Sequence, residues 1–136
     1  MQTTKLLLIV LPVLAFLLTA CQNKNNEIIN KENNKNLIVL VKYKSQPSKS
    51  KEAVAGLTKL IEAVKNEPNF VNITLHVDPK DETNILLYEE WSNEAYYNGD
   101  HMKTAHLQKF MEDSRAYLVG PPEISQWKVE KEFKGK

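Results

Sequence analysis

The pattern of apolar and polar residues predicts two kinds of strand in the region that begins at Leu37. Residues 37–43 are almost all apolar or aromatic, which is typical of a largely buried strand. Residues 70–77 alternate between two sets, which indicates a strand with one dry face. Phe70 falls in the set with the polar residues, so we expect it on the opposite face. The dry face is predicted to carry Val71, Ile73, Leu75 and Val77.

Helical spacing occurs in two longer stretches. Apolar residues recur every three or four positions over 54–64, and Pro68 is expected to stop that helix. A second main helix is predicted over 104–118, where a glycine and two prolines follow. A shorter helical piece over 93–97 precedes it. Gly99 is expected to end this piece in the left-handed conformation.

Two further strands complete the predicted fold. One covers 85–91 after a turn at 78–82, and the last covers 124–133. The order strand, helix, strand, strand, helix, strand predicts an α+β fold of the ferredoxin-like, split βαβ type. Such a fold (β-α-β-β-α-β) has one antiparallel sheet with both helices on one face. Its second face is also apolar, so we expect a partner subunit to cover it.

The start of the chain is typical of an exported protein. Residues 1–20 hold one charge, Lys5, and their apolar run over 6–18 is shorter than the roughly 20 residues that span a bilayer. Leu18-Thr19-Ala20-Cys21 resembles the bacterial lipobox. The resemblance implies cleavage of a 1–20 signal peptide and a diacylglyceryl (palmitate-type) lipid on Cys21. The alternative is an ordinary signal peptide that a cysteine happens to follow.

Amino-acid composition indicates that the segment directly after Cys21 does not belong to the folded domain. Seven of the fifteen residues over 22–36 are asparagine, so we predict that 21–36 is a disordered, lipidated tether. The folded domain is then expected over 37–133. The full chain carries 18 basic and 17 acidic residues, a balance that gives no reason to expect nucleic acid as a partner. The predicted location is outside the cytoplasm, at the cell membrane or the periplasmic or outer-membrane face.

Spacing alone predicts no metal site. His101 and His106 are five positions apart, about 140° around a continuous helix, so their rings are predicted not to converge. Glu89 and Glu90 are neighbours on a strand and are expected to point to opposite sides. The chain contains four glycines, and they form no phosphate-binding loop.

One segment resembles the antibiotic biosynthesis monooxygenase family of dimeric α+β barrels. In that family a strand ends in an aromatic, an acid, any residue and tryptophan, as in Tyr88-Glu89-Glu90-Trp91 here. A short helix, a histidine, four residues and a second histidine follow, matched by His101 and His106. Glu67-Pro68-Asn69 matches the family's Glu-Pro-Gly except at its last position. The resemblance implies a homodimer with its sheets face to face, and a pocket between sheet and helices in each subunit.

The resemblance also implies a reaction. Family enzymes are typically cofactor-free oxygenases of quinols and polycyclic phenols, because a phenolate can itself pass electrons to oxygen. We therefore expect a small aromatic or quinone-like substrate and no cofactor. Trp91 and Tyr97 are the candidates for pocket wall and hydrogen-bond donors, and His101 or His106 for the base. The structural alternative for each is core packing, helix capping or subunit contact.

Two other functions stay open at this point. Haem-degrading relatives use a strand-end tryptophan, a helix histidine and an asparagine on the first strand. The ten-residue separation of Trp91 and His101 is similar to theirs, but the first strand has no internal asparagine, and only Asn36 precedes it. Haem binding through His101 is therefore one alternative. The other is a dimeric binding module that has the fold without the chemistry.

Overall fold

A computed structural model describes residues 36–135. The predicted signal peptide, Cys21 and all but the last residue of the predicted tether lie outside the described residues. The strands are β1 (Leu37–Lys44), β2 (Phe70–Asp78), β3 (Asp81–Trp91) and β4 (Glu123–Lys128). The helices are α2 (Ser50–Val64), α3 (Glu94–Asn98) and α4 (Ala105–Asp113), with 3₁₀ turns η1 (His101–Lys103) and η2 (Ser114–Ala116).

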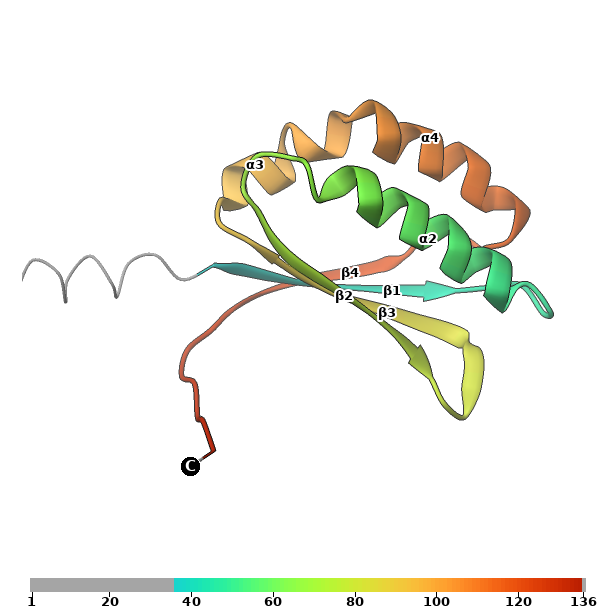
Figure 1. Ribbon diagram of the computed structural model, residues 1–136, viewed down its shortest axis with the longest axis horizontal. Helices are drawn as coiled ribbons and strands as arrows, with labels where there is room; N and C mark the ends of the chain where they lie inside the picture. Colours follow the sequence, from blue (N-terminus) through green and yellow to red (C-terminus); the bar gives the residue numbers. More distant parts are fainter. Residues whose placement is uncertain (1–35, 136) are drawn as a thin grey trace, which may run out of the picture. The chain divides into compact units, whose positions relative to one another are not determined.

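These elements form a two-layer α+β fold. The sheet order is β2-β3-β1-β4, and each neighbouring pair is antiparallel. Figure 1 shows the helices on one side of the sheet. The arrangement confirms the predicted ferredoxin-like fold. No helix within residues 36–135 is long and apolar enough to span a bilayer.

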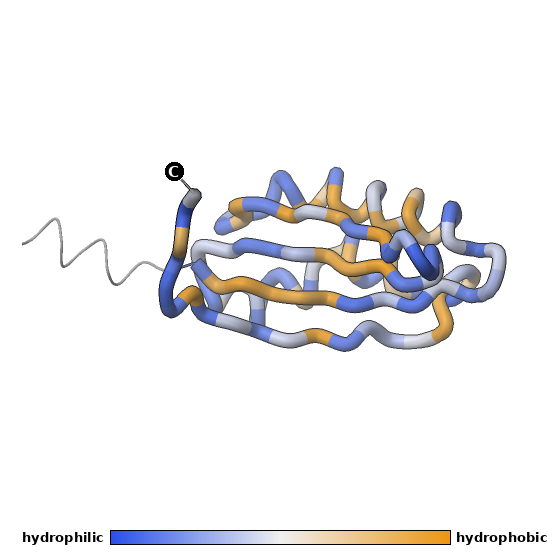
Figure 2. The backbone as a smooth tube through the Cα atoms, turned by 90° about the horizontal axis from the view of Figure 1, so that it is seen from below, coloured by the Kyte–Doolittle hydropathy of each residue, from blue (hydrophilic) through white to orange (hydrophobic). Residues whose placement is uncertain are grey.

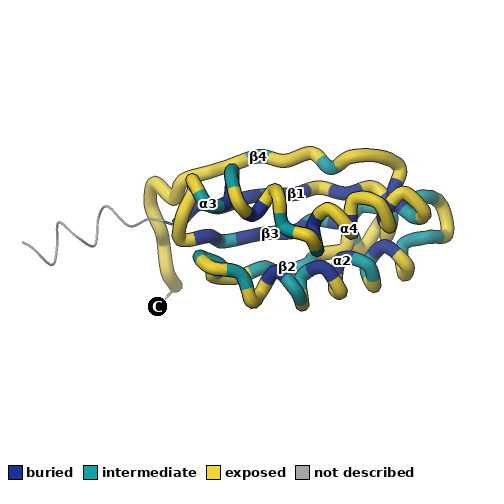
Figure 3. Tube along the Cα trace, turned by 90° about the horizontal axis from the view of Figure 1, so that it is seen from above, coloured by how far each residue is buried: buried dark blue, intermediate teal, exposed yellow. Residues whose placement is uncertain are grey.

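The core lies between the helices and the two central strands. Every second residue of β1 and β3 points toward the helices, as the period of a strand requires. Along α2, buried residues follow at intervals of three or four, as predicted. Figure 3 shows that β1 and β3 are the most buried strands, while β4 is exposed along the edge. The largest contributions to this core come from Val39, Val41, Leu57, Ile85, Leu87, Trp91 and Phe110.

The alternation predicted for β2 is wrong at its first residues. A β-bulge lies between Phe70, which pairs with Trp91, and Asn72, which pairs with Glu90. The extra residue, Val71, is exposed, and Phe70 packs edge-to-face on Trp91 with ring centroids 5.9 Å apart. Bulges of this kind are frequent on edge strands, where one residue can be left unpaired. The bulge puts the largest side chain of β2 into the core.

Three other boundaries differ from the predictions. The second main helix ends at Asp113 and continues as the 3₁₀ turn η2. Gly99 has a φ of −111°, so α3 ends without a left-handed residue. The last strand stops at Lys128 rather than 133, because Lys128 pairs with Leu37, the first residue of β1. Beyond that point β1 offers no further partner.

The sheet face away from the helices is apolar at its centre. Leu40 lies opposite Tyr88, and Ile38 lies opposite Trp127. Figure 2, which views the molecule from this side, shows apolar residues concentrated on the central strands. Trp127 is 57% exposed, although indole rings are usually well buried. We call Ile38, Leu40, Leu86, Tyr88 and Trp127 the outer face.

Candidate functional site

A cavity of about 610 Å³ lies between the helices and the sheet. Its size falls within the range of about 300–1,000 Å³ that is usual for small-molecule sites. Most of its wall is apolar and comes mainly from α2 and α4 on the helix side and from the central strands β1 and β3. The apolar wall includes Val41, Leu60, Ile61, Val64, Leu87, Leu107 and Phe110.

The cavity opens along β4. The residues around the opening are exposed, whereas those at the bottom are buried. One side of the opening is formed by helical residues and the other by the segment that leads into β4. We call these residues the mouth: Met102, Met111, Arg115, Val119, Gly120, Pro121 and Ile124.

Besides Ser114, four buried polar side chains interrupt the apolar wall. They are Tyr43 on β1, Glu89 on β3, Tyr97 on α3 and His101 on η1. Within residues 36–135 every fully buried side-chain nitrogen or oxygen has a hydrogen-bond partner. The hydroxyls of both tyrosines have no such partner in the described part of the chain, so these atoms are reached from the cavity. We call these four side chains the polar end of the cavity.

Glu89 has one hydrogen-bond partner among the described residues. The indole N–H of Trp91 donates to its Oε2 at 3.0 Å, which leaves Oε1 to face the cavity. The pKa of Glu89 is raised from 4.5 to about 7, chiefly by burial; the hydrogen bond from the Trp91 indole lowers it and the nearby Glu67 carboxylate adds to the increase. Near neutral pH, Glu89 is therefore divided between its acid and its carboxylate form.

Both cavity tyrosines are held in the protonated form. Burial raises the pKa of Tyr43 and of Tyr97, and the negative charge of Glu89 raises both further. A phenol that stays protonated can donate a hydrogen bond to an oxygen atom that gains negative charge. The polar end thus combines two permanent donors with a carboxyl group that can give or take a proton.

His101 lies between aromatic rings. Its ring stacks on Tyr97 with centroids 5.1 Å apart and an interplanar angle of 20°, and Trp91 lies 4.6 Å away on centroids. The Nδ1 atom is 2.9 Å from Oε2 of Glu67. The Nε2 atom makes no hydrogen bond with any described residue and is therefore reached from the cavity. The aromatic neighbours fix the ring in this orientation.

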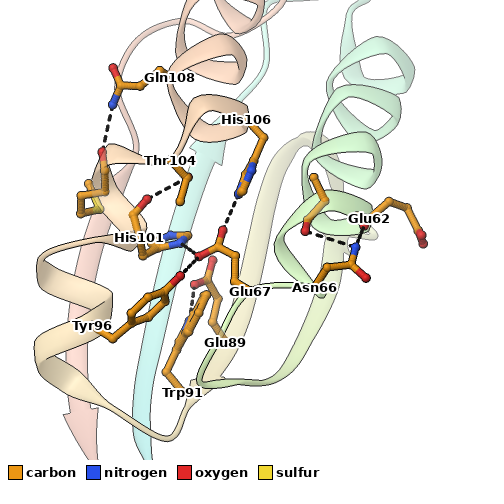
Figure 4. Close-up of polar contacts among 12 residues, drawn as sticks. Glu62, Asn66, Glu67, Glu89, Trp91, Tyr96, His101, Thr104, His106 and Gln108 are labelled. Carbon is orange, nitrogen blue, oxygen red and sulfur yellow. Dashed lines mark hydrogen bonds and ion pairs between the residues drawn. The ribbon is translucent and has the colours of Figure 1, made fainter.

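Glu67 is the centre of a second polar group behind the cavity wall (Figure 4). Its side chain is 5% exposed and is contacted by His101, by His106 Nε2 at Oε1 and by the Tyr96 hydroxyl at 3.1 Å. Glu67 follows α2 directly, and Asn69 two residues later has a φ of 66°. This left-handed conformation explains why asparagine can stand where the family has glycine, because asparagine tolerates it better than most residues.

The prediction that His101 and His106 do not converge is wrong. Both rings contact Glu67, one at each carboxylate oxygen. The 140° separation assumed a continuous helix, but Thr104 has an extended backbone (φ −63°, ψ 143°) that separates η1 from α4. Within residues 36–135, no group of three or more His, Cys, Asp or Glu side chains is arranged to hold a metal ion.

The predicted site residues fall in different places. Tyr97 and His101 line the cavity. Trp91 is fully buried behind the wall, where its N–H is occupied by Glu89. His106 lies in a separate groove between α2 and α4 and is 30% exposed. Trp91 and His106 therefore support cavity residues without lining the cavity themselves.

Sequence reasoning missed Glu89, Tyr43 and the position of Glu67. Glu89 was considered only as a pair with Glu90, and the two do point to opposite sides, since Glu90 accepts a hydrogen bond from Asn36 on the outer side. The missed signal was the period of the strand. Glu89 shares its face with Leu87 and Trp91, so an acid occupies a position that the pattern assigns to the core.

The sequence profile described as antibiotic biosynthesis monooxygenase matches residues 36–113. The chain belongs to this family. The match includes all four residues of the polar end and Glu67, but not β4 or most of the mouth. No curated protein gives a significant match to the chain.

Solved structures agree with the family fold. A Pseudomonas aeruginosa protein is 21% identical with a TM-score of 0.65, over 71% of this chain and 96% of its own. A crystal structure of an antibiotic biosynthesis monooxygenase is also 21% identical, with a TM-score of 0.63 over 70% and 99%. A conserved Methanosarcina mazei protein is 18% identical, with a TM-score of 0.63 over 72% and 96%. At these identities the similarity shows the fold alone.

Proposed function

We propose that this member of the monooxygenase family oxidises a quinol or another hydroxylated aromatic ring without a cofactor. The observation that carries the proposal is the polar end, where Tyr43, Glu89, Tyr97 and His101 offer buried polar groups to a largely apolar cavity. An aromatic ring fits the apolar part, and its hydroxyl group would meet His101 and Glu89. The mouth offers the apolar side chains of Met111, Val119 and Ile124 to a substituent on the ring.

His101 Nε2 acts as the base in this proposal. It takes the proton of the substrate hydroxyl and forms a phenolate, which is electron-rich enough to reduce oxygen. The hydroxyls of Tyr43 and Tyr97, which stay protonated, donate hydrogen bonds to the negative charge on the reduced oxygen. The imidazolium then returns its proton to the oxygen atom that leaves.

The reaction balances without an outside reductant. One atom of O₂ bonds to a ring carbon, which loses its hydrogen, and the other atom leaves as water. For a hydroquinone this gives a hydroxyquinone, and for a phenol a quinone. The substrate supplies all four electrons and both hydrogen atoms of the water, so His101 gives back each proton that it takes.

Oxygen consumption tests this proposal. With a panel of hydroquinones, naphthols and naphthoquinols, we expect the purified chain to consume one O₂ per substrate and to release no hydrogen peroxide. The same solutions without protein correct for spontaneous oxidation. If no substrate of the panel is consumed above this background, and none binds, the proposal is wrong.

Haem binding through His101 is the competing hypothesis. Its Nδ1 is held by a carboxylate and its Nε2 is reached from the cavity, an arrangement common among histidines that bind metal centres. Addition of hemin to the same preparation separates the two functions. A shifted Soret band that His101→Ala abolishes would favour haem, and an unchanged free-hemin spectrum would exclude it.

The lipid on Cys21 fits such a substrate. We propose that the chain is exported and anchored, which would keep the domain within reach of quinols dissolved in the membrane. Tethering raises the effective concentration of a substrate that shares the same surface. The support for this part is the lipobox resemblance together with the apolar mouth.

We also propose that two copies pack through the outer face. The central strands there carry the partly exposed side chains of Leu40, Leu86 and Tyr88, beside the exposed ring of Trp127. Leu40 lies opposite Tyr88 near the centre of this face. Leu40→Lys would place an unpaired charge in this contact and is expected to shift the protein from dimer to monomer. Ala55→Lys on the exposed side of α2 adds the same charge elsewhere. Sedimentation of both variants measures their oligomeric state, and Ala55→Lys should remain dimeric. A dimeric Leu40→Lys protein would contradict the proposal.

A further inference from the structure

The carboxylate of Glu67 contacts two histidines, one on each side. Its Oε2 lies 2.9 Å from Nδ1 of His101, and its Oε1 is contacted by Nε2 of His106. Tyr96 donates its hydroxyl to Oε2 as well. A carboxylate can only accept hydrogen bonds, so each ring nitrogen that faces it must carry the proton. His101 faces the carboxylate with Nδ1 and His106 faces it with Nε2, so the two neutral rings must be opposite tautomers.

We propose that Glu67 is the positioning residue of the site, because it fixes the tautomer of His101. The inference rests on the proposed function in one respect, that His101 is the base. With the proton held on Nδ1, the lone pair of Nε2 faces the cavity. Without Glu67, the proton could move to Nε2, and His101 would meet the substrate as a donor instead of an acceptor.

Glu67 also lies where a protonated His101 needs a partner. When His101 takes the substrate proton, its Nδ1–H still faces Oε2 of Glu67 at 2.9 Å, so the two opposite charges are in hydrogen-bond contact. No other acidic group contacts the His101 ring within residues 36–135. Glu89 faces the cavity and is bound by Trp91, so it does not substitute for Glu67.

His106 and Tyr96 hold the Glu67 carboxylate in place. They come from α4 and α3, whereas Glu67 follows α2, so three elements meet at one side chain (Figure 4). Two residues after Glu67, the Asn69 carbonyl accepts from the Ser92 amide at 2.9 Å, which ties this loop to the end of β3. Burial raises the pKa of Tyr96, and its bond to Glu67 raises it further, so the hydroxyl stays a donor. The family pattern contains two histidines, although only His101 lines the cavity. The contact of His106 with Glu67 gives the second histidine a role in holding this carboxylate.

The test measures tautomers directly. In the protein labelled with ¹⁵N-histidine, at an alkaline pH where imidazoles are neutral, long-range ¹H–¹⁵N spectra distinguish protonated from bare ring nitrogens. We expect Nδ1–H for His101 and Nε2–H for His106. His76, which is exposed on β2 and hydrogen-bonds to no described residue, serves as the reference for a free imidazole in the same spectrum.

The matched variants are Glu67→Gln and Tyr96→Phe. A glutamine can donate as well as accept, so we expect His101 to lose its fixed Nδ1–H form, and kcat to fall about 10- to 100-fold with little change in KM. Tyr96→Phe removes one hydrogen bond from the same carboxylate and should keep the His101 tautomer. A merely structural role would make the two variants alike.

Two results would overturn the inference. One is an Nε2–H form of His101 in the wild-type protein, which needs no variant to fold and no active substrate. The other is an unchanged Nδ1–H form in Glu67→Gln. If no substrate is oxidised by the wild type, the proposed function fails, whereas the spectra still decide whether Glu67 sets the tautomer.

Discussion

Replacing His101 by asparagine is expected to lower the kcat of oxygen consumption by about 100- to 10,000-fold, the usual contribution of a general base. The amide nitrogen of asparagine can take the place of Nδ1 and keep the hydrogen bond to Glu67, while nothing replaces Nε2. The variant therefore removes the base and preserves the buried polar contact behind it. Initial rates at saturating substrate and oxygen measure the loss.

The matched control is His76→Asn, the same exchange on the exposed side of β2. It should leave kcat unchanged. Thermal unfolding of both variants verifies that the fold is kept. A His101→Asn protein that retains more than about a tenth of the wild-type kcat would show that another group takes the proton, and Glu89 would be the first to examine.

The stability of the wild-type protein is expected to decrease as pH rises from 4.5 to 7, because of Glu89. Burial raises the pKa of this residue in the folded state to about 7, whereas the unfolded chain ionises at 4.5. Between these values the unfolded state releases a proton that the folded state retains, so unfolding becomes more favourable. The loss is about 3 kcal/mol, since each pKa unit corresponds to about 1.4 kcal/mol.

Glu89→Gln should remove this contribution. The glutamine carbonyl can still accept from the Trp91 indole, so the variant loses the charge and keeps the hydrogen bond. Urea unfolding of both proteins at several pH values gives the difference. Glu90→Gln, on the opposite and half-buried side of β3, is the control and should follow the wild type. Parallel curves for wild type and Glu89→Gln would contradict the burial of an ionisable carboxyl group here.

Much of the fold could be predicted from hydrophobic periodicity. The apolar run of β1 and the spacing of Leu57, Leu60 and Val64 on α2 are local signals that survive in the structure. The bulge at Val71 is not local, because it depends on pairing with β3 and on the burial of Phe70 against Trp91. A strict alternation in the sequence gives no sign of it.

The site was less predictable than the fold for the same reason. Glu67 and His101 are 34 positions apart, and nothing near either residue predicts their contact. The convergence of His106 on the same carboxylate depends on one extended residue, Thr104. The helix predicted over 104–118 already leaves His101 outside it, so the continuous helix assumed for the two histidines disagreed with that prediction. A second available signal was Glu89, an acidic residue on the same face of its strand as Ile85 and Leu87.

The arrangement of polar and apolar residues in the cavity has a consequence for the choice of substrate. Its polar end is buried, whereas the exposed residues of its lining form the mouth. In the proposed reaction, a substrate would enter with its hydroxylated ring first, and a substituent on the ring would stay among Met111, Val119 and Ile124. The enzyme would then select strictly for the hydroxylated ring and tolerate different substituents on it. Substrates with long and short substituents would react alike, and the product would leave through the same mouth.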